Sequence, residues 1–139
     1  MASTRYCDLP KIISAATVLA LTTPSPAKAD CLSYGPTRVS IAGTLNRIVF
    51  SNPRGDPEPY FVLRLQQPVC MTGEARDEDK PFLSDILAIQ LLLTETQYAQ
   101  FRPLLGKRVR LSGSLVAAET GHHHTPVIMG DVVLAEEQK

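Results

Sequence analysis

The sequence predicts a mainly β fold with five strands and one short helix. Apolar and polar residues alternate with a period of two along residues 108–115, which is typical of a half-buried strand. The run Thr94-Glu95-Thr96-Gln97 is a capping-box pattern, and it predicts a short helix between the third and fourth strands. A helix at this place in a five-stranded order is typical of an OB-like small barrel. We therefore predict that fold, with a β-sandwich carrying an incidental helix as the alternative.

Turn-forming and charged segments separate the predicted strands. Residues 51–59 contain three prolines and a glycine, and residues 66–80 form a second long connection. Gly43 and Gly113 fall inside strands on their apolar sides, where they predict bulges or the tight bends of a strongly coiled sheet. The predicted strands span residues 39–50, 60–65, 86–93, 108–115 and 127–134.

The predicted helix begins after Thr94 and is short. Tyr98, Phe101 and Leu105 form its apolar side, and we expect them to pack in the core rather than to form a ligand platform. The proline at position 103 limits the regular length of the helix, and Gly106 is a plausible C-terminal stop.

The first 29 residues have the composition of a secretory signal peptide. Basic residues precede a short apolar run over residues 12–21, and residues 27–29 fit the small-x-small rule for cleavage. We expect cleavage after Ala29, which leaves a single domain over residues 30–139. The apolar run is well short of the ~20 residues that a membrane-spanning helix needs, so no transmembrane segment is expected in the mature form. The protein is expected to be periplasmic or secreted.

The charge balance argues against a nucleic-acid partner. Removal of three basic residues and one acidic residue from 14 of each leaves a mature chain with a net charge of −2. That charge gives no strong field for nucleic acid or for an anionic membrane. Arg102, Lys107, Arg108 and Arg110 form a local basic cluster, but the chain has no tryptophan and no set of aromatic side chains for base stacking.

Cys31 and Cys70 are the two cysteines that remain after removal of the predicted signal peptide. An even pair in a chain exported to an oxidising compartment predicts a disulfide. Closing a loop of this length would stabilise the fold by about 4 kcal/mol in the chain-entropy model. The alternative is a pair of thiols that bind metal or act in redox chemistry, and no C-x-x-C spacing supports it.

Three consecutive histidines, His122, His123 and His124, carry the most unusual chemistry of the chain. If their backbone is extended, His122 and His124 converge and His123 points away. Two imidazoles on one side could ligate zinc, copper or nickel, with Glu119 or Asp131 as a third ligand. The alternative is that the histidines hydrogen-bond within the loop or are exposed. Because no other spaced ligand set accompanies them, the expectation is no cofactor, with a metal as the alternative.

Other polar residues offer weaker functional signals. Asp56 and Glu58 lie in a predicted loop and are expected to be solvated, because nothing in the sequence buries them. Tyr60, Val62 and Arg64 share one face of a predicted strand, and OB-type barrels bind ligands on such a face. No G-x-S-x-G, P-loop or G-x-G-x-x-G motif is present. The sequence thus favours a non-enzymatic module for an unknown protein or cell-envelope ligand; the alternative is a metal-binding protein, or a metal-dependent enzyme.

Short sequence segments spread over most of the predicted mature chain form a recognisable pattern. The most specific are C-L-S-Y, P-V-C, R-P-L-L-G-K and T-G-H-H-H-T-P. Together they resemble a small bacterial exported family catalogued only as a domain of unknown function. The resemblance implies a secreted or periplasmic bacterial protein, and it supplies neither an activity nor catalytic residues. The segments are residues 31–34, 41–45, 60–65, 68–70, 98–107 and 120–127.

Overall fold

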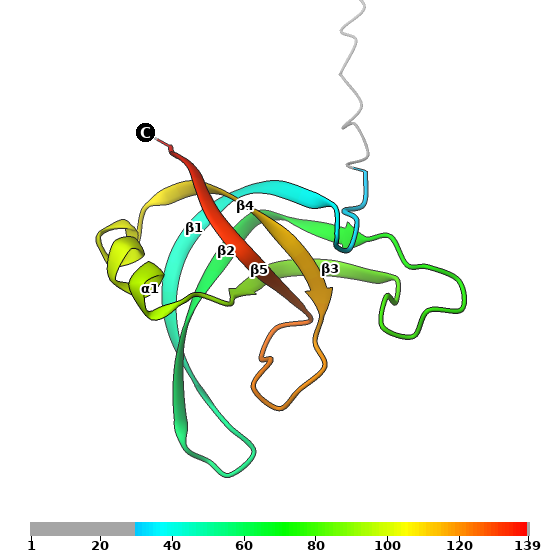
Figure 1. Ribbon diagram of the computed structural model, residues 1–139, viewed down its shortest axis with the longest axis horizontal. Helices are drawn as coiled ribbons and strands as arrows, with labels where there is room; N and C mark the ends of the chain where they lie inside the picture. The colour runs from blue at the N-terminus through cyan, green and yellow to red at the C-terminus, as the bar shows by residue number, and fades with distance from the viewer. Residues whose placement is uncertain (1–29, 139) are drawn as a thin grey trace, which may run out of the picture.

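The computed structural model describes residues 30–138. The predicted signal peptide, residues 1–29 with cleavage after Ala29, lies outside the described residues, as does Cys7. The described chain forms one β-sheet with a short helical segment (Figure 1). The strands are β1 (Arg38–Ser51), β2 (Pro57–Met71), β3 (Leu83–Leu91), β4 (Arg108–Ala117) and β5 (Val127–Glu137), and the helices are α1 (Glu95–Phe101) and the 3₁₀ helix η1 (Arg102–Leu104).

The five strands form a closed barrel in the order β1-β2-β3-β5-β4. Neighbouring strands are antiparallel, except that β3 and β5 run parallel over a short stretch. The helical segment connects β3 to β4 and lies at one side of the sheet (Figure 1). The prediction of a mainly β fold with five strands and one short helix after the third strand is confirmed.

Several strands are longer than the sequence predicted. β2 does not end at Leu65 but continues to Met71, through the first part of the segment assigned to a connection. Its pairing with β3 is irregular there, with register shifts between Arg64 and Val69 and between Val69 and Met71. Glutamines and a proline in this stretch removed the alternating pattern, because the bulged part of the strand has no regular inward and outward faces.

Gly43 and Gly113 lie where two strands approach too closely for a side chain. A Cβ atom at Gly43 would lie 2.5 Å from the carbonyl oxygen of Arg64, and one at Gly113 would lie 2.6 Å from the carbonyl oxygen of Gly130. At Thr44, the residue after Gly43, β1 passes from pairing with β4 to pairing with β2. Gly113 lies within a register shift between β4 and β5. Both glycines therefore mark irregular or tightly packed points of the barrel, as the sequence predicted.

Apolar side chains from all five strands fill the barrel, and the helical segment adds to the same core. Their burial supplies the main stabilisation of a domain of this size. Completely buried examples, one from each strand, are Leu45, Leu63, Ile89, Leu111 and Met129.

The predicted capping box opens α1. The backbone N–H of Gln97 donates to Thr94 Oγ1 at 3.2 Å, and the backbone N–H of Thr94 donates to Gln97 Oε1 at 3.0 Å. Gln97 Nε2 also donates to the carbonyl oxygen of Val132 at 2.7 Å, which joins the start of the helix to β5. Among residues 30–138 there is no helix with the length and apolar character needed to cross a membrane.

The predicted disulfide is present and joins Cys31 to Cys70. The segment before β1 is held beside the end of β2 by backbone hydrogen bonds as well. Leu32 donates to the carbonyl oxygen of Cys70 at 2.7 Å, and Thr72 donates to that of Leu32 at 2.8 Å. The disulfide therefore fixes the entry of the chain into the barrel.

Candidate functional site

The β1–β2 hairpin extends beyond the barrel. β1 pairs with β4 only as far as Thr44, and β2 pairs with β3 only from Val62 onward. Within residues 30–138, residues 46–61 therefore have no strand neighbour outside the hairpin. A hairpin of two strands is marginally stable by itself, so contacts on its faces decide where it lies. Successive side chains point to opposite faces. One face carries Phe50, Glu58 and Tyr60, and the other carries Arg47, Pro59 and Phe61.

The first face of the hairpin is covered by the loop between β4 and β5, which we call the histidine loop (residues 118–126). Figure 1 shows this loop and the hairpin tip at the same end of the molecule. The imidazole of His124 lies flat on the ring of Phe50, with centroids 4.5 Å apart and ring planes 5° apart. Its centroid is 5.7 Å from that of Tyr60. The His124 side chain is 11% exposed, so it is largely buried against the hairpin.

Glu58 joins the hairpin to the histidine loop. Its two carboxylate oxygens lie 2.6 Å from His122 Nδ1 and 3.0 Å from His124 Nε2. Because an ionised carboxylate only accepts hydrogen bonds, both ring nitrogens donate. The hydrogen bond from His124 is the largest cause that holds the pKa of Glu58 below its ordinary value; partial burial opposes the shift, and His122 supports it.

The expectation that Glu58 is solvated is wrong. Its side chain is only 17% exposed, whereas that of Asp56, two residues earlier, is 65% exposed, as expected. The sequence could not distinguish the two carboxylates, because the partners of Glu58 lie more than 60 residues away in the chain. We call the contacts of Glu58 with His122 and His124, together with the stacking of His124 on Phe50, the clasp.

Gln90 fixes the histidine loop from the side of the barrel. Its side chain is completely buried, and it uses both ends of its amide. The backbone N–H of His124 donates to Gln90 Oε1 at 2.7 Å, and Gln90 Nε2 donates to the carbonyl oxygen of His122 at 2.9 Å. These two bonds set the loop backbone that turns both imidazoles toward the hairpin. Sequence reasoning missed Gln90, although it is the one polar residue in the apolar run 86–93.

The structure separates His123 from the other two histidines of the predicted metal site. His122 and His124 converge, but on a carboxylate of the hairpin rather than on Glu119 or Asp131. His123 is separate, and its Nδ1 accepts a hydrogen bond from the backbone N–H of Glu119 at 2.9 Å. Within the described range, no group of three or more His, Cys, Asp or Glu side chains is placed to hold a metal ion. Zinc, copper or nickel binding stays a prediction of the sequence.

The three residues of the predicted ligand face of β2 differ in exposure. Val62 is completely buried, so it cannot contact a ligand. Tyr60 is half-buried beside His124, and Arg64 is exposed. Val62 is paired with Gln90, which holds the histidine loop over this part of the sheet. The alternation in β2 carried no information about a loop that folds back over part of this face.

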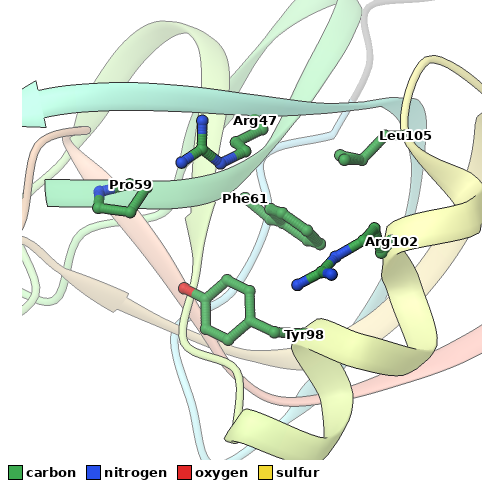
Figure 2. A pocket seen from close by; sticks show the side chains of 6 residues that line it. All are labelled: Arg47, Pro59, Phe61, Tyr98, Arg102 and Leu105. Atoms are coloured by element: carbon green, nitrogen blue, oxygen red, sulfur yellow. The ribbon is translucent and has the colours of Figure 1, made fainter.

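The second face of the hairpin lines a pocket between the hairpin and the helical segment. The volume of the pocket is about 530 Å³, within the range typical of small-molecule sites. Figure 2 shows Phe61 at its centre, with the side chains of Arg47, Arg102 and Tyr98 around it. The rings of Phe61 and Tyr98 meet edge to face, with centroids 4.9 Å apart and planes at 73°. The lining residues are Arg47, Pro59, Phe61, Tyr98, Arg102 and Leu105.

The pocket is positively charged. Arg47 and Arg102 are exposed, and within residues 30–138 neither forms a salt bridge or a side-chain hydrogen bond. Among the described residues, no acidic side chain lines the pocket. Burial is the largest cause that raises the pKa of Tyr98, so its phenol is neutral at pH 7. The pocket therefore combines two cationic groups with an aromatic wall, and Tyr98 is part of that wall as well as a packing contact of Phe61.

The basic cluster predicted around the fourth strand is divided by the fold. Arg102 belongs to the pocket. The other three basic side chains bond to side chains at the end of β5 and just beyond it. Lys107 and Arg110 meet carboxylates there, whereas Arg108 bonds to a neutral amide. These pairs are Lys107 with Glu137 at 2.9 Å, Arg108 with Gln138 at 2.8 Å and Arg110 with Glu136 at 3.3 Å.

Comparison with known proteins adds a family but no activity. Residues 88–133 match the model of a family described as a domain of unknown function (DUF4431). The matched segment includes Gln90, Arg102 and the three histidines. It begins after the β1–β2 hairpin, so it does not include the hairpin residues of the pocket. No curated protein matches the chain. Over residues 88–133 the chain is thus similar to the DUF4431 family, which confirms the resemblance to a domain of unknown function.

Proposed function

We propose that this protein is an exported, disulfide-stapled, non-enzymatic binding module built on an OB-like barrel. Its ligand site is the pocket between the β1–β2 hairpin and the helical segment. The observation that supports this proposal is the lining of the pocket, in which two arginines without ionic partners among residues 30–138 flank a wall formed by Phe61 and Tyr98. Such a concave site with an apolar wall and a few polar groups is typical of ligand binding.

The OB-like assignment is supported by the topology. The strand order β1-β2-β3-β5-β4 and the helical connection between β3 and β4 are typical of that barrel. The proposed site differs from the face of β2 that the sequence favoured, because Val62 of that face is completely buried and His124 of the histidine loop packs beside Tyr60. The clasp then has a structural role, since it holds the hairpin that forms one wall of the pocket.

We propose a non-enzymatic module because of the side chains that line the pocket. In the part of the chain that the structure describes, they include no carboxylate, histidine, serine, threonine or cysteine, so this lining offers no nucleophile paired with a general base. The arginines remain charged at physiological pH and are suited to recognition rather than to proton transfer. These side chains support selective binding of a ligand.

Export is supported by the disulfide and by the composition of residues 1–29. Disulfides persist in oxidising compartments such as the periplasm or the cell exterior and are rare in the cytosol. The proposed partners are accordingly a protein or a ligand of the cell envelope. N-terminal sequencing of material from the periplasm or the medium should begin at or near Asp30, and a chain that still begins at Met1 would contradict the proposed processing.

A protein-detected NMR screen against small aromatic acids, neutral aromatics and sugars tests the binding site. Compounds that bind should shift the amide signals of the pocket residues, and Leu105→Trp should abolish binding because a larger side chain fills the pocket. Val133→Trp is the matched control, since Val133 is 55% exposed and does not line the pocket. The proposed site would be contradicted if the compounds shift amide signals of other surfaces equally in both variants. It would also be contradicted if no compound binds.

A further inference from the structure

We infer that the pocket takes a small organic anion with a flat apolar body. Its carboxylate or phosphate group lies between Arg47 and Arg102, and its apolar body lies against Phe61 and Tyr98. This inference rests on the proposed binding function and adds the chemical class of the ligand. It follows from three features of the pocket: its uncompensated charge, its apolar wall and the way in which its hairpin wall is held.

The first feature is the charge. Arg47 comes from β1 and Arg102 from η1, so tertiary folding brings both guanidinium groups to one pocket. Figure 2 shows the two side chains around the ring of Phe61. Two like charges repel each other, and in the described residues no carboxylate offsets them. Each guanidinium presents donors in a planar fork that matches a carboxylate or a phosphate, so an anion between them satisfies both.

The second feature is the apolar wall. Phe61 is 4% exposed and forms the base of this wall, and the half-buried Tyr98 packs against its edge. The apolar surface open to a ligand therefore belongs mostly to Tyr98 and to the residues beside it. Pro59 and Leu105 continue the apolar lining on either side. A bare inorganic anion would leave this surface in water, whereas a flat apolar body would cover it. A volume of about 530 Å³ suits a molecule of one or two rings.

The third feature is the support of the hairpin. Glu58 and Tyr60 alternate along β2 with Pro59 and Phe61, so the face held by the clasp is the reverse side of the pocket wall. A wall fixed in this way loses less conformational entropy when a ligand binds. Glu58 is therefore a positioning residue for the pocket, and it does not touch the ligand.

The two main probes that test the inference have nearly the same shape, and only one of them is charged. We would measure the dissociation constants of 3-phenylpropanoate and of its neutral amide for the purified protein by calorimetry or NMR. The carboxylate is expected to bind at least about tenfold more tightly than the amide, because only the carboxylate engages both guanidinium groups. This preference should shrink at high salt, since screening weakens the interaction of exposed charges. Acetate, which lacks the apolar body, should bind more weakly than both aromatic probes.

The variants that test the inference are Arg47→Gln and Arg102→Gln. Each should weaken binding of 3-phenylpropanoate by about fivefold or more and leave binding of the amide almost unchanged. Arg76→Gln is the matched control, because Arg76 is exposed and does not line the pocket. Thermal melting of each variant shows whether the fold is intact, and both pocket arginines are exposed, so their replacement should not unfold the protein.

Two further binding measurements identify which kind of molecule carries the anionic group. Phenyl phosphate tests whether a phosphate group replaces the carboxylate. A peptide that ends in a phenylalanine carboxylate, compared with the same peptide ending in an amide, tests whether the anion is a chain terminus rather than a free small molecule. Preference for the free acid over the peptide supports a small-molecule ligand, and the reverse preference supports a peptide terminus carrying the same chemistry.

The outcomes separate the inference from the proposed function. Equal binding of the carboxylate and the amide in the pocket would overturn the inference and keep the binding function. Binding of the carboxylate that persists in both arginine variants would place the anion elsewhere and would also overturn the inference. If no probe and no compound of the NMR screen binds the folded protein, both the inference and the proposed function are wrong.

Discussion

The imidazole of His124 lies parallel to the ring of Phe50, with centroids 4.5 Å apart, and its Nε2 donates to Glu58 at 3.0 Å. Phe50 and Glu58 belong to opposite strands of one hairpin and are directly paired in the sheet. A single side chain of the histidine loop therefore holds both strands of the hairpin, in a region where no other strand of the described chain pairs with them. The loop is held in turn by Gln90 in the barrel.

Replacement of Glu58 by alanine should loosen the hairpin. Both imidazoles lose their acceptor, so we expect a lower melting temperature, on the order of a few degrees. Glu78→Ala is the control, because it removes the same charge from an exposed side chain and should leave the melting temperature unchanged. Equal melting temperatures of the two variants would show that the clasp adds nothing to stability.

The contribution of Glu58 should depend on pH. Its folded pKa lies below the ordinary value of 4.5, so ionised Glu58 stabilises the fold at pH values above that value. This stabilisation should decrease as the pH falls below the ordinary pKa of about 4.5, and it should be lost once the pH is below the lowered pKa of Glu58 in the folded protein. The difference in free energy of unfolding between the natural protein and Glu58→Gln should accordingly shrink on acidification between pH 6 and pH 3. A difference that grows over this range would contradict the sign of the shift.

Gln90→Leu should open the histidine loop. The variant keeps the size of the buried side chain but removes the partners of His124 N–H and of the His122 carbonyl, which should cost about 1–3 kcal/mol of unfolding free energy. Urea unfolding measures the cost, and hydrogen exchange should show faster exchange in residues 118–126. Gln100→Leu, at an exposed position of α1, should change neither quantity.

Two glycines on neighbouring strands, Gly113 in β4 and Gly130 in β5, should respond differently to alanine. At Gly113 a Cβ atom would lie 2.6 Å from a backbone oxygen, so Gly113→Ala forces the strands apart and should cost about 1–3 kcal/mol. At Gly130 no atom lies within 4 Å of the added Cβ, so Gly130→Ala should change stability by less than about 0.5 kcal/mol. Similar urea midpoints for the two variants would refute the close approach at Gly113.

The disulfide should be both formed and stabilising. In the unreduced, unfolded protein Cys31 and Cys70 should resist a thiol reagent, and both should react after reduction, as peptide mapping can show. The double variant Cys31→Ser/Cys70→Ser should lose about 2–4 kcal/mol of unfolding free energy, mostly because its unfolded chain is less constrained. Labelling of either cysteine before reduction would contradict the bond.

The local order of the chain could be predicted where short-range patterns determine it. The capping box at Thr94 and Gln97 specified the start of α1, because both hydrogen bonds are made within four residues. Period-two alternation placed β4, and the even pair of cysteines indicated the disulfide. Prediction was weaker for β2, whose irregular pairing with β3 hides the alternation beyond Leu65.

The candidate site depended on contacts between distant parts of the chain. His122 and His124 were singled out by the sequence, but their acceptor Glu58 was assigned to a solvated loop. Arg47, Phe61 and Arg102 carry no common motif, so no sequence signal joined them in one pocket. The sequence by itself determined the β class, the helix start and the disulfide, because these depend on local patterns and cysteine number. Only the tertiary structure decided the pocket and the clasp, because both arise where the barrel brings β1, β2, the helical segment and the histidine loop together.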